Sequence, residues 1–431
     1  MEYCLSLLKF LSAFWGIKLI KSRLKFGLWL MIIYLLLGSL GTSCAPSHDF
    51  DKSLKTITRP YRFSIARWEL HALFEEVKNI FNNHQKGIDD GVSEITVYFK
   101  TVEQINNVES KVEAIKAGNS QGDLAPLEAE LNKLLQQNTA AADTVERLME
   151  SQIRKTLSQQ GIFNPIDKYV RLKVGFPPVN FKLSEPPHLL VVSPRDRIEI
   201  IKEIALLPEM SVEAMESIEG EINKLDVSSL VVALGGYSTY PSFVMADGDL
   251  RFTLDAATEE WLHQYLTFKP LGFRYLLDLA GIFRDYDVAT IDETLASMVS
   301  KEVGAIIYES RYAVKETGNP RTETAGAGFD FNQEMREIRR AVDNYLAQGE
   351  IKQAEEFMEQ KRQFLATRGY HIRKLNQAYF AFHGTYADSP ASISPIGVEL
   401  KKLRSQCASL KDFLEAVASM TSRQDLVESV K

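Results

Sequence analysis

The 431-residue chain is poor in cysteine and has no excess of positive charge. Its three cysteines cannot build a dense disulfide framework. Its 50 lysine and arginine residues are outnumbered by 57 aspartate and glutamate residues, a formal net charge of −7, whereas nucleic-acid-binding proteins need a basic surface. The sequence also lacks a phosphate-binding loop, a dinucleotide fingerprint and a Gly-x-Ser-x-Gly elbow. These absences argue against nucleic-acid partners and against enzymes built on those three motifs.

The composition that remains is that of a folded protein. Apolar residues make up 45% of the chain and charged residues 25%, which is ordinary for soluble globular domains. This balance excludes a disordered chain and a membrane protein with many spans. The length is sufficient for one large domain or for two to three smaller ones.

The first 43 residues differ in charge from the remainder. They hold five of the 50 basic residues and one of the 57 acids, so residues 44–431 carry 45 basic and 56 acidic residues, a net of −11. The basic start leads into an apolar stretch at 26–40 that ends in small residues, an order typical of an export signal. Because the positive charges stay on the cytoplasmic side, the chain that follows should be translocated.

The end of this segment, Leu-Gly-Thr-Ser before Cys44, resembles a bacterial lipoprotein signal, in which small residues precede a cysteine that becomes lipidated. Gly41 departs from the aliphatic residue that is usual three positions before that cysteine. The alternative is an uncleaved single-span anchor, for which the apolar stretch is slightly short of the roughly 20 residues required. Both interpretations make the membrane a partner and place the body in the cell envelope, on the outer face of the cytoplasmic membrane.

Patterns of hydrophobicity predict an α+β fold that is predominantly α. The expected segments are a signal or anchor at 1–43, a polar tether at 44–60, a helical region at 61–165 and an α+β domain with a helical C-terminal part at 166–430. The helical region should contain an antiparallel hairpin with helices over 94–116 and 124–159. The α+β domain should have strands at 169–174, 189–193 and 228–234, with a helix at 197–221.

One short segment combines residues that suit metal chemistry. The sequence Asp-Ala-Ala-Thr-Glu-Glu-Trp-Leu-His at 255–263 predicts a helix, with Asp255 as its N-cap. Glu259 and His263 are four residues apart, so their side chains project from one helical face. Glu260 lies about 100° further round the helix.

This segment resembles the His-Glu-x-x-His motif of zinc metallopeptidases with the first histidine replaced. In that register Glu259 and His263 are metal ligands and Glu260 is the general base that takes a proton from the metal-bound water. In the gluzincin class a glutamate on the next helix completes the site, and Glu293, 30 residues after His263, is the candidate. The resemblance implies a zincin-like fold, a zinc cofactor and hydrolysis of peptide bonds.

Glutamate in place of the first histidine changes the expected chemistry. Two carboxylates and one imidazole donate more charge, so the ion becomes a weaker Lewis acid and manganese or iron is an alternative to zinc. A non-functional interpretation also exists, in which Glu259 and Glu260 are solvated acids in the first helical turn, favoured by the helix dipole. A third interpretation is a degenerate peptidase domain that no longer catalyses.

Two further groups of residues are candidates by analogy with such enzymes. A strand containing Gly235, Gly236, Tyr237 and Tyr240 is expected to bind a peptide substrate by strand addition. In the C-terminal helical region, Tyr379, His371 and His383 are candidates for stabilising the oxyanion of the tetrahedral intermediate, although residues of these types are common at the edge of a core. The sequence thus predicts either a membrane-anchored extracytoplasmic metallopeptidase or a non-catalytic envelope lipoprotein with a binding or structural role.

Overall fold

A computed structural model describes residues 48–65, 91–118, 120–165, 175–279, 282–313 and 329–431. The chain divides into Met1–Ser43 and Cys44–Lys431, and every described residue belongs to the second unit. The N-terminal apolar stretch, Cys44 and the strand expected at 169–174 lie outside the described residues. Among the helices that are described, none combines the length and the apolar character needed to cross a bilayer.

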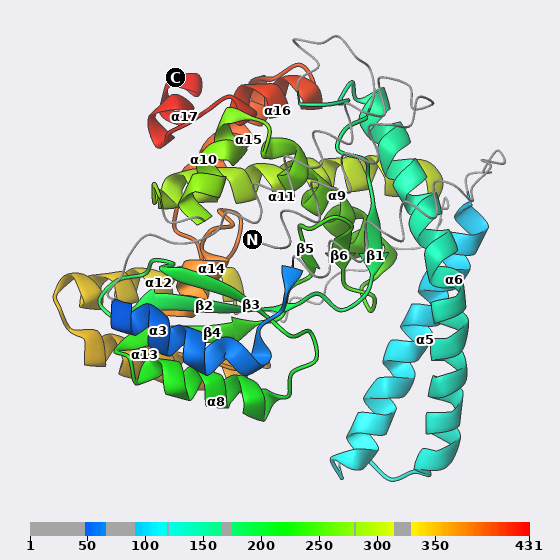
Figure 1. The fold of residues 1–431 in the computed structure, drawn as a ribbon, viewed down its shortest axis with the longest axis horizontal. Helices are drawn as coiled ribbons and strands as arrows, with labels where there is room; N and C mark the ends of the chain where they lie inside the picture. The colour runs from blue at the N-terminus through cyan, green and yellow to red at the C-terminus, as the bar shows by residue number, and fades with distance from the viewer. Residues whose placement is uncertain (1–47, 66–90, 119, 166–174, 280–281, 314–328) are drawn as a thin grey trace, which may run out of the picture. The chain divides into compact units, whose positions relative to one another are not determined.

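The described residues form a mainly helical α+β structure, as expected (Figure 1). The helices are α3 (His48–Thr58), α5 (Val92–Lys116), α6 (Leu124–Gln159), α8 (Val212–Asn223), α9 (Leu250–Leu266), α10 (Pro270–Leu279), α11 (Tyr286–Arg311), α12 (Phe331–Ala347), α13 (Ile351–Thr367), α14 (Gln377–His383), α15 (Ile396–Gln406), α16 (Leu410–Ala418) and α17 (Arg423–Ser429), with a 3-10 turn at Arg59–Tyr61. The strands are β1 (Phe181–Leu183), β2 (His188–Pro194), β3 (Lys202–Leu206), β4 (Val227–Val232), β5 (Gly236–Tyr237) and β6 (Ser242–Val244).

Helices α5 and α6 form the predicted hairpin, which projects from the rest of the described structure (Figure 1). The buried residues of α5 recur at steps of three and four, which gives the helix one apolar stripe facing α6. Asp123 begins α6 by accepting a hydrogen bond from the amide of Ala125 at 3.1 Å. The base of the hairpin shares one hydrophobic core with α9 and α11, so residues 91–165 do not pack as a separate domain.

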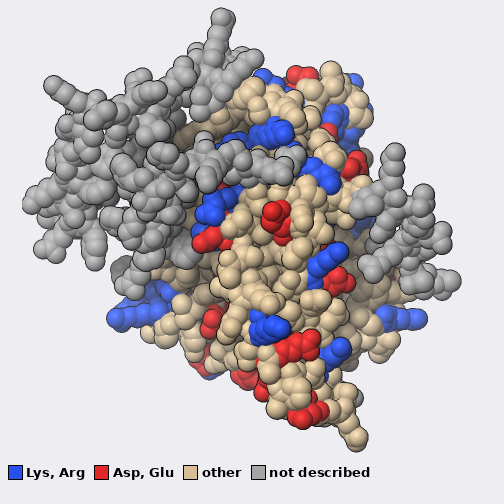
Figure 2. Space-filling model, turned by 90° about the vertical axis from the view of Figure 1, so that its right-hand side faces the viewer, with Lys and Arg blue, Asp and Glu red and all other residues tan. Residues whose placement is uncertain are grey.

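The face that includes the hairpin side of the molecule has a mixed charge. Figure 2 shows lysine and arginine side chains interspersed with aspartate and glutamate among larger uncharged areas. On the part of this face that the structure describes, no extended basic surface is visible, which agrees with the acidic net charge.

The first sheet is fully antiparallel and has the strand order β3-β2-β4. Helices α3 and α8 cover one face of it, and α14 covers the other. Two expectations are wrong here. Residues 48–58, predicted as part of a tether, form α3, which buries Leu54 against this sheet. The helix predicted at 197–221 is divided into β3 and α8, because β3 pairs with β2, Pro208 interrupts the chain and Ser211 caps α8.

The second sheet has the strand order β1-β6-β5. Strand β1 runs parallel to β6, and β5 runs antiparallel to β6 at the edge of the sheet. The single substrate strand expected between 235 and 244 is therefore two short strands. The chain turns between Tyr237 and Ser242, where Thr239 accepts a hydrogen bond from Ser242 at 3.2 Å, and Pro241 offers no amide hydrogen for a ladder.

Helix α9 is central to the described structure, because ten of its 17 residues are buried. It begins at Asp249, whose carboxylate accepts a hydrogen bond from the amide of Phe252 at 2.7 Å. Asp255, expected to be the N-cap, lies inside the helix and pairs with Arg251 at 3.0 Å. Helix α11 packs closely against α9 at Gly304, where a Cβ would lie 1.9 Å from Oδ1 of Asp255. Helices α15, α16 and α17 cover α11 from the other side.

Candidate metal centre

Glu259, Glu260 and His263 lie in the second half of α9, two turns or more beyond its start. The interpretation of the two glutamates as solvated first-turn acids is therefore wrong. Its premise was a helix start at Asp255, and the true cap six residues earlier moves both side chains into the packed part of the helix. Each of the three residues keeps part of its surface exposed, whereas the helix buries most of its neighbours.

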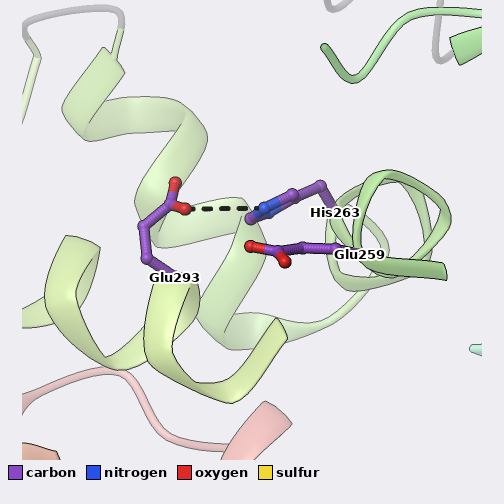
Figure 3. A group of neighbouring side chains, drawn as sticks. All are labelled: Glu259, His263 and Glu293. Atoms are coloured by element: carbon purple, nitrogen blue, oxygen red, sulfur yellow. Dashed lines mark ion pairs between the residues drawn. The ribbon is translucent and has the colours of Figure 1, made fainter. Parts of the chain in front are cut away.

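Side chains from α9 and α11 converge on one point. Glu259 and His263 project side by side from α9, and Glu293 reaches toward the imidazole from α11 (Figure 3). One ligand atom from each residue lies within 4.8 Å of the other two, and Nε2 of His263 is 3.6 Å from Oε2 of Glu293. A tetrahedral ion with bonds of about 2 Å holds its ligand atoms about 3.3 Å apart. Small side-chain rotations would bring these three donors to that spacing, so the donor set fits a divalent ion.

A hydrogen bond to Asp292 on α11 orients the imidazole of His263. Nδ1 of His263 lies 3.2 Å from Oδ2 of Asp292, whose side chain is 1% exposed. Because the carboxylate accepts a hydrogen bond from Nδ1–H, Nε2 is the nitrogen left to bind an ion once it gives up its proton. Asp292 and Glu293 are consecutive, so one turn of α11 supplies both the group behind the imidazole and the group in front of it.

Two tyrosines orient Glu293. The hydroxyl of Tyr275, on α10, donates a hydrogen bond to Oε1 of Glu293 at 2.6 Å, which leaves Oε2 directed at His263. The hydroxyl of Tyr386, in the loop between α14 and α15, also hydrogen-bonds Glu293. That loop is attached to α11, because the amide of Ala387 donates to Oγ1 of Thr294 at 3.0 Å. Such outer hydrogen bonds are usual around ligands of a metal.

The centre brings several carboxylates together in a partly buried site, and their mutual repulsion shapes its electrostatics. Burial raises the pKa of Glu259 to about 7 and that of Glu260 to about 8; the charge of His263 opposes this rise, and repulsion from neighbouring carboxylates adds to it. Burial alone would lower the pKa of His263, but Glu293 and Asp292 outweigh it and hold that pKa well above its usual value. A divalent cation among these groups would relieve the repulsion and favour the ionised carboxylates.

Glu260 lies beside the edge strand β5. A Cβ placed on Gly236 would lie 2.3 Å from Oε1 of Glu260, so a larger residue at 236 would displace this carboxylate from its present position. The main chain is tied at the same place, since Ser238 Oγ donates to the carbonyl of Glu260 at 3.0 Å. Tyr237 is partly buried on β5 and Tyr240 is buried in the turn that follows. Gly236 thus brings the backbone of an edge strand to the side chain expected to act as base.

The three oxyanion candidates lie elsewhere. Tyr379 and His383 share α14, with ring centroids 4.3 Å apart, and α14 covers the first sheet. Burial is the cause of their pKa shifts, upward for Tyr379 and downward to about 4 for His383, with no contribution from the acids of the metal centre. His371 is exposed. The structure therefore does not bring these three residues to Glu259, His263 and Glu293.

Tyr275, Tyr386 and Asp292 occupy the centre and were not singled out from the sequence. Asp292 could have been noticed, because it precedes a candidate ligand on a predicted helix. The two tyrosines carry no sequence signal, since one lies on an intervening helix and the other in a loop 93 positions beyond Glu293. Comparison with known proteins adds no further residues: no family model, no curated protein and no solved structure matches this chain.

Proposed function

We propose that this protein is a metal-dependent peptidase with a zincin-like arrangement, in which Glu259, His263 and Glu293 hold the ion and Glu260 is the general base. The observation that carries the proposal is the convergence of these three donors beside a further carboxylate, that of Glu260, which contacts an edge strand. The chain order of edge strand, helix with two ligands and later helix with a glutamate ligand supports the gluzincin-like assignment.

Different residues of the chain have different roles in the proposed hydrolysis. An extended peptide pairs with β5, the edge strand of its sheet, and so has its scissile carbonyl near Glu260. Glu260 accepts the proton of the attacking water and passes it to the leaving amine. Tyr386 replaces Tyr379 as the proposed oxyanion donor: its hydroxyl, which hydrogen-bonds Glu293, would turn to the oxyanion when the substrate is bound. A bound divalent ion supplies Lewis acidity and makes the attacking water more acidic.

Zinc is the proposed ion because the donor number and geometry suit it. Two carboxylates with a single imidazole are harder than the usual zinc set, so manganese and iron(II) are the competing ions. A second candidate function is a non-catalytic envelope protein that retains the fold and the ion. Glu259 favours it, because this carboxylate stands where the metallopeptidase motif has its first histidine.

The assay that separates these functions uses the purified full chain in detergent, loaded with zinc, manganese or iron(II) in turn. We expect cleavage of unstructured peptides with at least one of these ions, complete loss of cleavage on chelation and recovery when the ion is restored. Stoichiometric binding without any cleavage would reject the peptidase and support the non-catalytic protein.

We also propose that the N-terminal segment anchors the body at the outer face of the cytoplasmic membrane through lipid on Cys44, a proposal supported by the sequence of residues 1–46 alone. Cys44→Ser should then prevent processing and abolish labelling of the chain by a radioactive fatty acid. If the variant is the same size as the wild-type chain and equally membrane-bound, residues 26–43 act as an uncleaved anchor instead.

A further inference from the structure

Phe252 is an exposed aromatic residue on the same side of α9 as the metal centre. From Phe252 to the end of α9, the residues that keep part of their surface exposed are Phe252, Asp255, Glu259, Glu260 and His263. At 100° per residue, these side chains project within one sector of the helix about 140° wide. The open side of α9 is therefore a continuous stripe, with the residues of the metal centre toward one end and an aromatic ring at the other.

The ring of Phe252 lies against the start of the edge strand. A Cβ placed on Gly235, the residue before β5, would lie 2.7 Å from Cζ of Phe252, and a Cβ on the next residue, Gly236, would lie 2.3 Å from Oε1 of Glu260. Two consecutive residues thus lie against the ring and against the carboxylate, where β5 packs on α9 (Figure 1). The ring and the proposed general base are therefore neighbours along one strand and along one helix.

Main chain at two glycines supports the ring and leaves it accessible. Besides Gly235, Gly248 lies against the ring, because a Cβ there would be 2.3 Å from Cδ1 of Phe252. Neither glycine covers the ring with a side chain, and Phe252 is 36% exposed. A single exposed apolar residue is ordinary on a protein surface, but this one adjoins the strand on which a peptide is proposed to bind. Covering the ring with an apolar group of that peptide would be favourable.

The direction of the bound peptide decides which of its residues meets Phe252. Antiparallel pairing is the more stable arrangement, and a peptide antiparallel to β5 runs from Tyr237 toward Gly235. Its residues after the scissile bond then pass over the ring. Residues 252 and 260 are separated by about 12 Å of helix, and an extended peptide advances about 3.3 Å per residue, so the ring is within reach of about three residues after that bond.

We propose that Phe252 forms a substrate-binding subsite for an aromatic or other large apolar side chain within about three residues C-terminal to the scissile bond. This inference rests on the proposed peptidase function and names the substrate class of that site: peptides with a large apolar residue after the cleaved bond. Phe252 is a specificity-determining residue, because its ring contacts the substrate but has no proton to transfer.

The test measures binding separately from cleavage. The zinc-loaded full chain carrying Glu260→Gln is titrated calorimetrically with two blocked peptides, one with a single phenylalanine among alanine and serine residues and one with alanine in its place. Loss of the phenylalanine should raise the Kd about tenfold, because its apolar burial and its contact with the ring are lost. Adding Phe252→Ala should give both peptides the same Kd, and Phe252→Leu should leave a smaller difference. In digests by the wild-type chain, mass spectrometry should place the phenylalanine within about three residues after the cut.

Phe273→Ala is the matched control, because it removes a phenylalanine that is 48% exposed on a different helix, and it should keep the difference between the two peptides. Equal Kd values for the two peptides, binding of neither, or a difference that survives Phe252→Ala would each overturn the inference, as would products with the phenylalanine before the cut. Cleavage that depends neither on the phenylalanine nor on Phe252 would reject the subsite and leave the peptidase. Binding of the phenylalanine peptide through Phe252 without any cleavage would reject the peptidase and leave the recognition.

Discussion

Replacing Glu260 with glutamine should lower kcat/KM for peptide hydrolysis by about 10²- to 10⁴-fold, because the side chain can then no longer accept a proton from water. Glutamine has nearly the same shape, so it should occupy the same space beside Gly236, and the metal should remain bound because Glu260 is not one of the three converging donors. The measurement is steady-state kinetics on the metal-loaded full chain, with metal content determined on the same samples.

Two glycine variants examine the same position without altering a charge. Gly236→Ala would place a Cβ 2.3 Å from Oε1 of Glu260, so this flexible carboxylate should move and cleavage should fall with little change in stability. Gly220→Ala, on α8 with no atom within 4 Å of the added Cβ, should leave cleavage unchanged. Full activity in Glu260→Gln would show that Glu260 is not the general base. Full activity in Gly236→Ala would show that cleavage does not depend on the position of the Glu260 carboxylate.

Removing the metal should destabilise the protein, and the loss should be greater at pH 8 than at pH 6.5. The folded-state pKa values of Glu259, about 7, and Glu260, about 8, lie above the 4.5 of an unperturbed glutamate. The pKa of His263 is also raised. In this pH range the folded metal-free protein therefore holds protons that the unfolded chain has released, so its stability falls as pH rises. The change should be on the order of a few kcal/mol.

A bound divalent ion should reverse this trend, because it favours the deprotonated glutamate and the neutral imidazole. Thermal unfolding of the zinc-loaded and chelated full chain at pH 6.5, 7.2 and 8.0 measures the difference. His383, whose pKa is lowered to about 4, contributes equally to the zinc-loaded and chelated curves and so cancels from their difference. Glu259→Gln should flatten the pH dependence of the chelated protein. Parallel curves with and without zinc would contradict the electrostatic account.

Short-range patterns explain which parts of the fold could be predicted. The hairpin was predicted within two residues at each helix end, because a stripe of apolar residues and a Gly-rich turn are local signals. Strand β3 was predicted as helix because its isoleucine-rich segment suits either state until its pairing with β2 is known. The helix start at Asp249 was missed for a similar reason: Asp249 and Asp255 are both good cap residues, and the sequence does not distinguish between them.

In the candidate site, too, the residues linked by short-range patterns could be predicted and those linked by tertiary packing could not. Glu259 and His263 could be paired from their spacing alone, since i and i+4 share a helical face. Glu293 was expected only by resemblance to the gluzincin class, and the packing of α9 on α11 brings it within reach. Tyr275 and Tyr386 depend on contacts between separate elements, to which no periodicity or spacing in one sequence points.

The most direct test of the account is the metal content of the purified full chain, measured by elemental analysis after dialysis against zinc and then against zinc-free buffer. We predict one ion per chain in the wild type and in Glu309→Gln, which alters an exposed acid on the same helix as Glu293. We predict no retained ion in His263→Ala, and a metal affinity about 10- to 100-fold lower in Asp292→Asn, because that residue orients the imidazole. A wild-type chain that retains no divalent ion, or a His263→Ala chain that retains as much as the wild type, would contradict the metal centre.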